Sequence, residues 1–431
     1  LPAPPSPPSP RRYYALKIQR KKDLVETYLD DPKRLETEKT VFACCHHPFI
    51  VDLDYSMQTP ACALLVLSLA NAGNLQDVIN DAKNYRVPPQ RVQFYAAEII
   101  LAIAHLHDLN LMYRDLKPSN VLLCEDGHIQ LADMGGVADC GGSVLGKDRV
   151  DPRLHRSSDG KNRRRSIMGT KGYMAPEMVK LLGQKRYERV GYTFMVDYWS
   201  LGITIYKLLT GKRPFDKRRF EAFLDKQATE EEANLANKNK EYAMLRSEVD
   251  YPAHLDENSK SIVKGLLTVE ENERLSVDSL RKHKFFASID WDCLGQKHVI
   301  PPFLPTPKEY PTKTSYSSFD SMLDQLSKAR QQSGQYDVDW KEGVAETDQQ
   351  LFNTWDFVSP HTLKVEMGIA GEMEAHDTNF KVQQVMGAGS VEASPAMEGR
   401  GIMDSIKSIT PIEQGRKLIK RMSQGHVDAM T

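Results

Sequence analysis

Apolar segments with strand-like spacing dominate the first part of the chain. The stretch YYALKIQ at 13–19 is apolar apart from one lysine, and it predicts a buried strand. The segments FIVDLDYSM and ALLVLSL lie on either side of the turn QTPAC, so we expect them to pair as antiparallel strands. Between the first strand and this pair, residues 32–44 carry a helical pattern.

From about residue 75 the spacing of apolar residues becomes helical. NLQDVINDAK and RVQFYAAEIILAIAHLHDLN place apolar residues three and four positions apart. A short strand pair is predicted in NVLLCEDGHIQLAD, where the dipeptide DG supplies the turn. Helical spacing returns in VDYWSLGITIYKLLTG and ends near residue 286.

Other regions lack this regular spacing. Residues 135–168 are glycine-rich and then strongly basic, which predicts a long mobile loop. Residues 287–365 carry scattered aromatic residues and prolines, as we expect of an ordered tail wrapped on a domain. The Pro/Ser-rich head and the region after 366 predict disorder, except for a short helix at 411–422.

Composition and charge narrow the class of protein. The 431 residues are 40% hydrophobic and 27% charged, and the net charge of −1 gives no reason to expect nucleic-acid binding. The longest apolar runs are too short to span a membrane. The cysteines show no CxxC spacing, which favours reduced thiols in the cytosol or nucleus over disulfides or a zinc site. They are Cys44, Cys45, Cys62, Cys124, Cys140 and Cys293.

The densest group of reactive residues lies in LMYRDLKPSNVLL, followed by ADMGG and GTKGYMAPE. Asp115 and Lys117 lie two positions apart in a loop that Pro118 keeps from being helical. Asn120 and Asp133 flank the predicted strand pair and offer the hard oxygen ligands that Mg²⁺ prefers. A carboxylate for a substrate hydroxyl, a cation for the transferring group and two oxygen ligands for Mg²⁺ are what phosphoryl transfer requires.

These motifs resemble the catalytic core of eukaryotic protein kinases, with YRDLKPSN for HRDLxxxN and DMG for DFG. Tyr before Arg-Asp is similar to the AGC group. VQFYAAEII, GTKGYMAPE, VDYWSLG and KHKFF followed by IPPFLP most resemble its G-protein-coupled-receptor kinase branch. The resemblance covers about 13–365. It implies a bilobal α+β fold, with a small mostly β lobe, a larger mostly α lobe and an AGC-type C-terminal tail.

The resemblance also implies a serine/threonine protein kinase that uses ATP and Mg²⁺ in signalling. Lys17 would then pair with the nucleotide phosphates and with Glu38. Taken alone, a single lysine in an apolar strand is most simply a strand residue that extends its ammonium group to solvent. The downstream motifs favour the phosphate-binding role instead. The other nucleotide-binding residues implied are the gatekeeper Leu67, the adenine-binding Ser68 and Ala70, and the apolar pair Ala15 and Leu122.

Catalytic and structural roles follow from the same resemblance. Asp115 would orient or deprotonate the substrate hydroxyl, Lys117 would stabilise the γ-phosphoryl group, and Thr170 would support both. Asn120 and Asp133 would hold Mg²⁺. The remaining roles are an ion pair between Glu177 and Arg274, a contact from Asp197 to the catalytic-loop backbone, and an apolar stack of Phe42, Leu53, Tyr113 and Met134.

Two segments suggest regulation. Ser166 follows three arginines and stands where the AGC pattern places its activation-loop phosphosite, so a phosphate there could pair with Arg114; a solvated basic loop without a phosphosite is the alternative. FNTWDFV resembles the AGC hydrophobic motif, with Phe352, Trp355 and Phe357 docking beside the helix that carries Glu38. Asp356 stands where a phosphoresidue would be and would supply a fixed negative charge. Ordinary core packing of these aromatic residues is the alternative.

The resemblance and the sequence each suggest binding partners for the chain. The substrate implied is a protein Ser/Thr hydroxyl, with an activated receptor as one candidate, and we expect a monomer. Asn74 and Ser119 occupy positions where arginine-directed AGC kinases often carry glutamates, which argues against a strict basic consensus. The basic amphipathic segment at 411–422 could contact an anionic membrane, although a solvated helix is the simpler interpretation.

No glycine-rich loop precedes Lys17 in the sequence, where only sixteen residues stand. We therefore expect a truncated small lobe and a fragment of an active kinase, in which the absence of the glycine-rich loop could leave this chain itself inactive. A non-catalytic kinase-fold scaffold or binding module is the alternative. The predicted organisation is a Pro-rich head at 1–12, a truncated small lobe at 13–69, a large lobe at 70–286 with an insertion at 136–168, a tail at 287–365 and an extension at 366–431.

Overall fold

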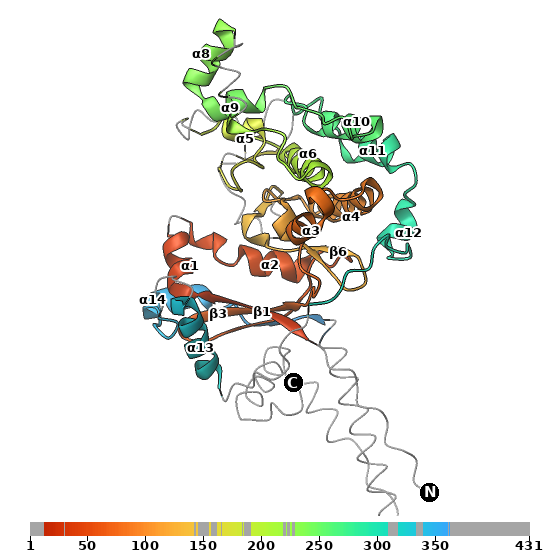
Figure 1. Cartoon of the computed structure of the whole chain (residues 1–431). Coiled ribbons are helices and arrows are strands. Elements are labelled where there is room, and N and C mark those ends of the chain that lie inside the picture. Colours follow the sequence, from red (N-terminus) through yellow and green to blue (C-terminus); the bar gives the residue numbers. More distant parts are fainter. Residues whose placement is uncertain are drawn as a thin grey trace, which may run out of the picture. The chain divides into compact units, whose positions relative to one another are not determined.

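The computed structural model divides into two compact units. Unit 1 takes the described residues within 1–35, 53–68 and 313–431, and unit 2 takes those within 36–52 and 69–312. The described residues are 13–29, 31–141, 144, 155–156, 162–164, 166–182, 184, 191–218, 221, 225, 229–308, 318–332, 339–360 and 362. The head at 1–12 and the predicted helix at 411–422 lie outside them. Figure 1 shows the elements of both units.

A four-stranded antiparallel sheet forms the centre of unit 1, with the strand order β1-β3-β2-β10. β1 (Tyr14–Arg20) pairs with β3 (Cys62–Ser68) along its whole length, which places Ala15 opposite Leu67 and Lys17 opposite Leu65. β2 (Leu53–Gln58) pairs with the other side of β3. The strand predicted at 13–19 and the predicted antiparallel pair are therefore both confirmed. Phe49–Val51, which the pattern included in the strand pair, lies outside β2.

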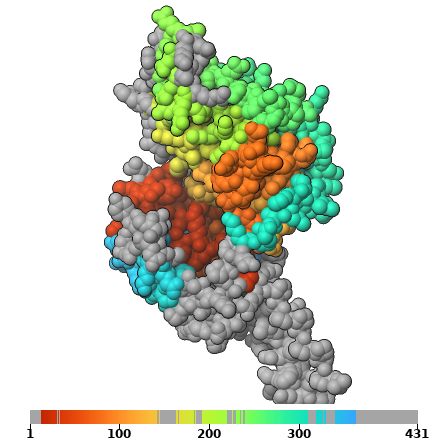
Figure 2. Space-filling model, viewed as in Figure 1, coloured from red at the N-terminus to blue at the C-terminus, as the bar shows by residue number. Residues whose placement is uncertain are grey.

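One face of this sheet packs against the tail. The helix α13 (Phe319–Gln332) contributes Leu323, which joins Trp340 in an apolar cluster with Cys62 and Leu64 of β3. In Figures 1 and 2 the cyan and blue residues of the tail lie directly beside the red strands of unit 1. The tail is thus ordered over these residues, and the sequence pattern did not predict the fourteen-residue helix in it.

The aromatic motif of the tail is anchored on the same sheet. β10 (Phe357–Val358) pairs with β2, with Phe357 opposite Ser56. Phe352 and Trp355 are both fully buried, and the Trp355 Nε1–H donates to the carbonyl of Leu64 at 3.2 Å. The Ser56 hydroxyl donates to the carbonyl of Trp355. The motif therefore docks on β2 and β3 of unit 1.

A buried lysine fixes the turn that precedes this motif. Lys21 begins α1 (Lys21–Thr27) and is fully buried, with Nζ donating to Gln58 Oε1 at 2.8 Å and to Gln349 Oε1 at 2.9 Å. Its ammonium group lies 4.7 Å from the centre of the Phe352 ring. Gln349 ends α14 (Glu346–Gln349), which leads into the turn η8 (Gln350–Phe352). Burial lowers the pKa of Lys21 to about 8, while the charge of Asp356 opposes this shift.

Unit 2 is built around two long helices. α4 (Pro89–Asp108) and α6 (Met195–Thr210) bury most of their residues and pack against each other, as helices that are apolar nearly all round must do. Pro89 starts α4 without losing a helical hydrogen bond, and Gly211 ends α6 with a φ of 74°. α3 (Leu75–Asp81) begins at a capping box formed by Asn74 and Asp77.

The other elements of unit 2 surround these helices. α10 (Glu257–Leu266) packs on α6, and α12 (Trp291–Gly295) packs on α4. Further helical elements of this unit include η2 (Lys83–Tyr85), α5 (Pro176–Val179), α8 (Glu230–Lys238), α9 (Lys240–Leu245), α11 (Val277–Arg281) and η7 (Lys284–Phe286). The helices predicted around α3, α4 and α6 are confirmed.

Two sequence expectations need correction. The helix predicted at 32–44 is interrupted: the turn η1 (Pro32–Arg34) and the helix α2 (Thr37–Cys44) are separated at residues 35–36. The loop predicted at 135–168 contains short elements among its described residues, because β7 (Ala138–Asp139) pairs with β4 (Leu111–Met112) and β8 (His155–Arg156) pairs with β9 (Asn162–Arg163). Pairing with β4, which lies more than twenty residues earlier in the chain, overrides the loop-like composition at β7.

The two compact units do not coincide with the domains predicted from the sequence. Residues 36–52 pack with unit 2, although they were assigned to the small lobe by sequence. The predicted domain boundaries therefore stay predictions. In the part of the chain that the structure describes, no helix is both long and apolar enough to cross a membrane.

The docked tail makes a prediction about stability. Trp355→Ala should lower the free energy of unfolding by about 3–5 kcal/mol, because it removes a fully buried ring and its hydrogen bond. Leu351→Ala is the matched control, since Leu351 is 37% exposed in the same segment and should change stability by less than about 0.5 kcal/mol. Urea denaturation followed by circular dichroism measures both. Equal effects of the two substitutions would contradict the docking.

The pKa of Lys21 makes a second prediction. Between pH 8 and 10.5 the unfolded chain keeps the Lys21 proton while the folded chain loses it, so the stability that Lys21 contributes should rise with pH in this window. Lys21→Met should lack the rise. Lys22→Met is the control, since Lys22 pairs with Glu342 at 2.7 Å on the surface and should leave the rise intact. Unfolding free energies of the three proteins between pH 7 and 10 test this, and parallel curves would refute it.

Candidate active site

The loop between β4 and the turn η3 (Pro118–Asn120) carries the predicted catalytic residues of unit 2. The Asp115 carboxylate accepts from Lys117 Nζ at 2.8 Å and from Thr170 Oγ1 at 2.6 Å, and Lys117 Nζ also lies 2.8 Å from Thr170 Oγ1. The side chains of Asp115 and Lys117 are 16% and 21% exposed, so a substrate could reach them. The structure therefore brings the three predicted catalytic side chains into one triangle of hydrogen bonds.

A buried carboxylate from α6 holds the backbone of this loop. Asp197 accepts from the Tyr113 N–H at 2.9 Å and from the Arg114 N–H at 2.6 Å, and its Oδ2 lies 2.8 Å from His107 Nε2. Its side chain is fully buried. Arg114, directly before the catalytic aspartate, has a φ of 72°, which is uncommon for a residue with a side chain. The contacts to Asp197 fix this conformation.

Asn120 and Asp133 offer the oxygen donors expected for a magnesium site. The amide nitrogen of Asn120 donates to the carbonyl and to Oδ2 of Asp115 at 3.0 and 3.1 Å, which leaves its amide oxygen for a cation. The Ala132 N–H donates to the Asn120 carbonyl at 3.0 Å, so the backbone before Asp133 lies beside Asn120. Asp133 has a left-handed φ of 57°. An amide oxygen and a carboxylate suit Mg²⁺, and the residues present fit that ion.

Gly136 allows the segment after Asp133 to approach the catalytic loop. A Cβ on this residue would lie 3.2 Å from the Tyr113 carbonyl and 3.4 Å from the Asp115 Cβ. Its own carbonyl accepts from Arg114 Nε at 2.6 Å. A larger residue would therefore push the two segments apart.

The guanidinium of Arg114 connects the catalytic loop to Ser166. Its Nη1 donates to the Ser166 hydroxyl at 2.9 Å and to the Tyr192 hydroxyl at 3.2 Å. The Tyr192 hydroxyl in turn donates to the Ser166 carbonyl. The structure thus brings together the two residues that the sequence paired for regulation.

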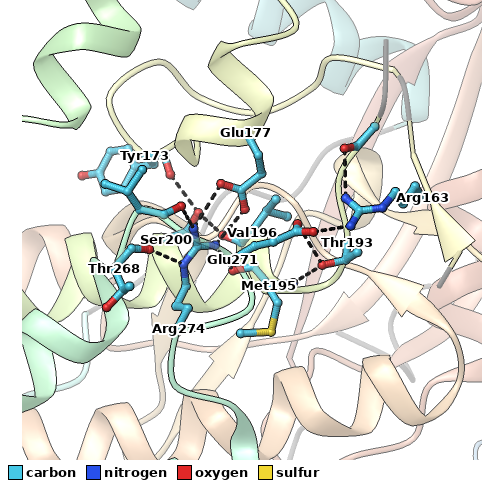
Figure 3. A network of polar contacts seen from close by, with 12 residues as sticks. Arg163, Tyr173, Glu177, Thr193, Met195, Val196, Ser200, Thr268, Glu271 and Arg274 are labelled. Atoms are coloured by element: carbon cyan, nitrogen blue, oxygen red, sulfur yellow. Dashed lines mark hydrogen bonds and ion pairs between the residues drawn. The ribbon is translucent and has the colours of Figure 1, made fainter. Parts of the chain in front are cut away.

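Figure 3 shows two buried ion pairs that support the neighbouring segments. Arg274 holds Glu177 in a bidentate pair at 2.8 and 3.1 Å, as the sequence predicted. Its guanidinium also donates to the carbonyls of Thr268, Met195 and Val269. Beside it, Arg163 pairs with Glu271, whose other oxygen accepts from Thr193 at 3.4 Å.

Residues 9–286 match the sequence family described as "Protein kinase domain". The chain belongs to the protein kinase family. Serine/threonine-protein kinase gad8 of Schizosaccharomyces pombe is 32% identical over 355 residues, which is 82% of this chain and 53% of that protein. The fold class is therefore confirmed as the α+β fold of protein kinases.

Other similar proteins point to the same group of kinases. Ribosomal protein S6 kinase 2 beta of Xenopus laevis is 31% identical over 306 residues, 70% of this chain and 41% of that protein. Serine/threonine-protein kinase AtPK1/AtPK6 of Arabidopsis thaliana is 31% identical over 320 residues, 73% of this chain and 58% of that protein. The chain spans about half the length of these relatives. They support the AGC group but not the receptor-kinase branch that the sequence suggested.

The predicted nucleotide-binding residues of the kinase lie on both units. In unit 1, Ala15 and Lys17 are two positions apart on β1 and so share one face of the sheet, while Leu67 and Ser68 end β3. In unit 2, Glu38 lies on α2, Leu122 on β5 (Val121–Leu123) and Ala70 precedes α3. The predicted pair between Lys17 and Glu38 would join the two units and stays a prediction.

The predicted apolar stack is also divided between the units. In unit 2, Phe42, Tyr113 and Met134 are all fully buried, and α2 packs against η4 (Met134–Gly136). The Tyr113 hydroxyl donates to the Ala132 carbonyl at 2.6 Å, and burial raises its pKa. Leu53 is buried in unit 1.

The sequence missed several residues that support the site. His107 contacts Asp197, Tyr192 contacts Ser166, and Glu271 pairs with Arg163. The β5 strand and β6 (Ile129–Leu131) pair as predicted. The Glu98 carboxylate of α4 accepts a hydrogen bond from the Ile129 N–H at 2.9 Å, and no local sequence pattern predicts this contact. Each of these contacts joins residues far apart in the chain.

Asp197 makes a prediction about the catalytic loop. Asp197→Asn should cost about 2–3 kcal/mol of stability, because the amide can accept fewer of the hydrogen bonds that the carboxylate receives. Amide hydrogen exchange at Tyr113 and Arg114 should accelerate, and urea denaturation gives the energy. Asp278→Asn, at an exposed position of α11, is the control and should change neither. Unchanged exchange at 113–114 in Asp197→Asn would contradict the role.

Proposed function

We propose that the protein transfers the γ-phosphoryl group of ATP to serine or threonine hydroxyls of protein substrates. The observation that supports this is the triangle of Asp115, Lys117 and Thr170, whose geometry suits a base and a cation acting at one point. The family similarity supports the same reaction class.

The chemistry follows from these side chains. The substrate hydroxyl oxygen forms a bond to the γ-phosphorus while the bond from that phosphorus to the bridging oxygen of ADP breaks. Asp115 orients the hydroxyl and accepts its proton. Lys117 neutralises charge on the transferring group, and Thr170 holds both side chains in position.

Asn120 and Asp133 would hold Mg²⁺, which neutralises phosphate charge when it is bound. Lys17 would pair with the α- and β-phosphates and with Glu38, which would hold the ammonium group in position. Ala15, Leu67, Ser68, Ala70 and Leu122 would bind the adenine.

Regulation is a further part of the proposal. A phosphate on Ser166 would gain a charge-assisted bond from Arg114, which already contacts its hydroxyl at 2.9 Å. Asp356 would act as a fixed negative charge beside Lys21. Burial lowers the pKa of Lys21, and the charge of Asp356 partly opposes this shift. A cytoplasmic monomer, a receptor substrate and membrane contact through 411–422 remain predictions from the sequence.

Two measurements test the proposed function. Mg-ATP should raise the melting temperature of the full chain, since a ligand at 100 times its Kd stabilises by about 2.7 kcal/mol. Asp133→Asn should abolish this shift. Asp115→Asn should keep the shift but lower phosphoryl transfer to a serine peptide by about 10²–10⁴-fold.

Asp278→Asn is again the matched control and should leave both readouts unchanged. A chain that shows neither a shift nor transfer would refute the proposal in favour of the kinase-fold scaffold. A shift that survives Asp133→Asn would refute the assigned metal role.

A further inference from the structure

A half-buried lysine lies beside the segment that touches the catalytic carboxylate. Lys207, in the last turn of α6, donates to the Tyr173 hydroxyl at 3.0 Å and to Gln76 Oε1. Both acceptors are neutral. Burial lowers the pKa of Lys207, and the charge of Arg213 lowers it further. No carboxylate of the described residues opposes this shift. This ammonium group is therefore partly desolvated without a compensating anion, which is unfavourable.

A second cation stands next to it. The Nη1 atom of Arg213 lies 2.0 Å from the point where a Cβ on Gly172 would stand, so the guanidinium lies directly against that glycine. Arg213 is exposed, and the structure records no ion pair for it among the described residues. Burial raises the pKa of Tyr173, and the charge of Arg213 opposes this shift. Arg213 therefore lies against Gly172, and Lys207 contacts the side-chain hydroxyl of the next residue, Tyr173.

The backbone of Gly172 and Tyr173 is close to the catalytic residues. The Tyr173 N–H donates to the carbonyl of Thr170 at 3.1 Å, and the Thr170 hydroxyl contacts Asp115. The Ser200 hydroxyl of α6 donates to the Tyr173 carbonyl at 2.9 Å, which fixes the segment to the helix that carries Lys207. A peptide whose hydroxyl reaches Asp115 would thus have neighbouring side chains near both cations.

The nearby polar residues do not neutralise the two cations. Asn74 uses its side chain to cap α3, accepting from the N–H groups of Gln76 and Asp77. Asp77 is engaged with Lys308 Nζ at 3.1 Å and with the Asn74 N–H. Ser119, in the turn η3 that packs beside α3, is neutral and exposed. Among the residues that the structure describes, none forms an ion pair with Lys207 or Arg213.

We propose that Lys207 and Arg213 form an anion-binding site for the substrate peptide, so that the enzyme prefers hydroxyls flanked by acidic groups. The proposal rests on the proposed kinase function and specifies its substrate class. The anion is a carboxylate or a phosphate on a residue near the acceptor. Two adjacent cations attract either group, and water is partly excluded from Lys207.

Three peptides that differ only beside the acceptor serine test the proposal on the full chain. One carries glutamates, one phosphoserine and one arginines. The ratio of kcat/KM for either acidic peptide to that for the arginine peptide should exceed about tenfold, and added salt should lower it. A preference for the glutamate peptide would identify carboxylate as the source, and one for the phosphoserine peptide would identify a phosphate.

Charge-neutralising variants locate the effect. Lys207→Gln retains a donor for Tyr173 and Gln76, and Arg213→Gln changes an exposed side chain, so both should fold. Each should lower the ratio by about fivefold, and the double variant should abolish the preference. Lys207→Arg and Arg213→Lys keep the charge and should keep the ratio. Lys264→Gln, on an exposed part of α10, is the control for net charge.

Fluorescence anisotropy of the same labelled peptides separates this proposal from the proposed function. If the acidic peptides bind the protein, bind more weakly to Lys207→Gln and no peptide is phosphorylated, the anion site is supported and the kinase activity is refuted. Transfer without preference for acidic peptides would refute the anion site and support the kinase activity. Equal or undetectable binding of all three peptides, with no transfer, would overturn both.

Discussion

The catalytic loop depends on one fully buried carboxylate. Asp197 is removed from water, and a charge in such a place is stable only when hydrogen-bond donors surround it. It receives them from the backbone of Tyr113 and Arg114 and from His107. Because these contacts set the left-handed backbone of Arg114, they direct its guanidinium toward Ser166 and place Asp115 beside Thr170. The order of the site thus begins at a residue that does not touch the substrate.

Local signals made a large part of the fold and site predictable. The strands β1, β2 and β3 and the helices α4 and α6 carry their own periodicity, and Asp115, Lys117 and Thr170 belong to short motifs. The interruption before α2, the helix α13 and the β4–β7 pair have no such signal, since distant packing decides them. The same holds for Lys21, whose partners lie 37 and 328 positions away. The contact of Lys207 with Gln76 likewise joins residues 131 positions apart.

The tail and the sheet of unit 1 depend on each other for polar as well as apolar contacts. Lys21, Gln58 and Gln349 satisfy one another's donors and acceptors around the Phe352 ring. A buried polar group of this kind tolerates few alternative arrangements, because any shift leaves a donor unpaired. The register of the tail on β2 is therefore specified by hydrogen bonds, whereas the aromatic rings supply most of the buried area.

The discontinuity of unit 1 has a consequence for biosynthesis. Ser56 and its partner Trp355 are 299 residues apart in the chain, and residues 69–308 of unit 2 lie between them. During translation the helices of unit 2 emerge before β10, so the outer edge of β2 waits without its strand while most of the protein is made. Completion of the sheet is thus a late event, and until then the nascent chain exposes the unpaired backbone N–H and C=O groups along one edge of β2.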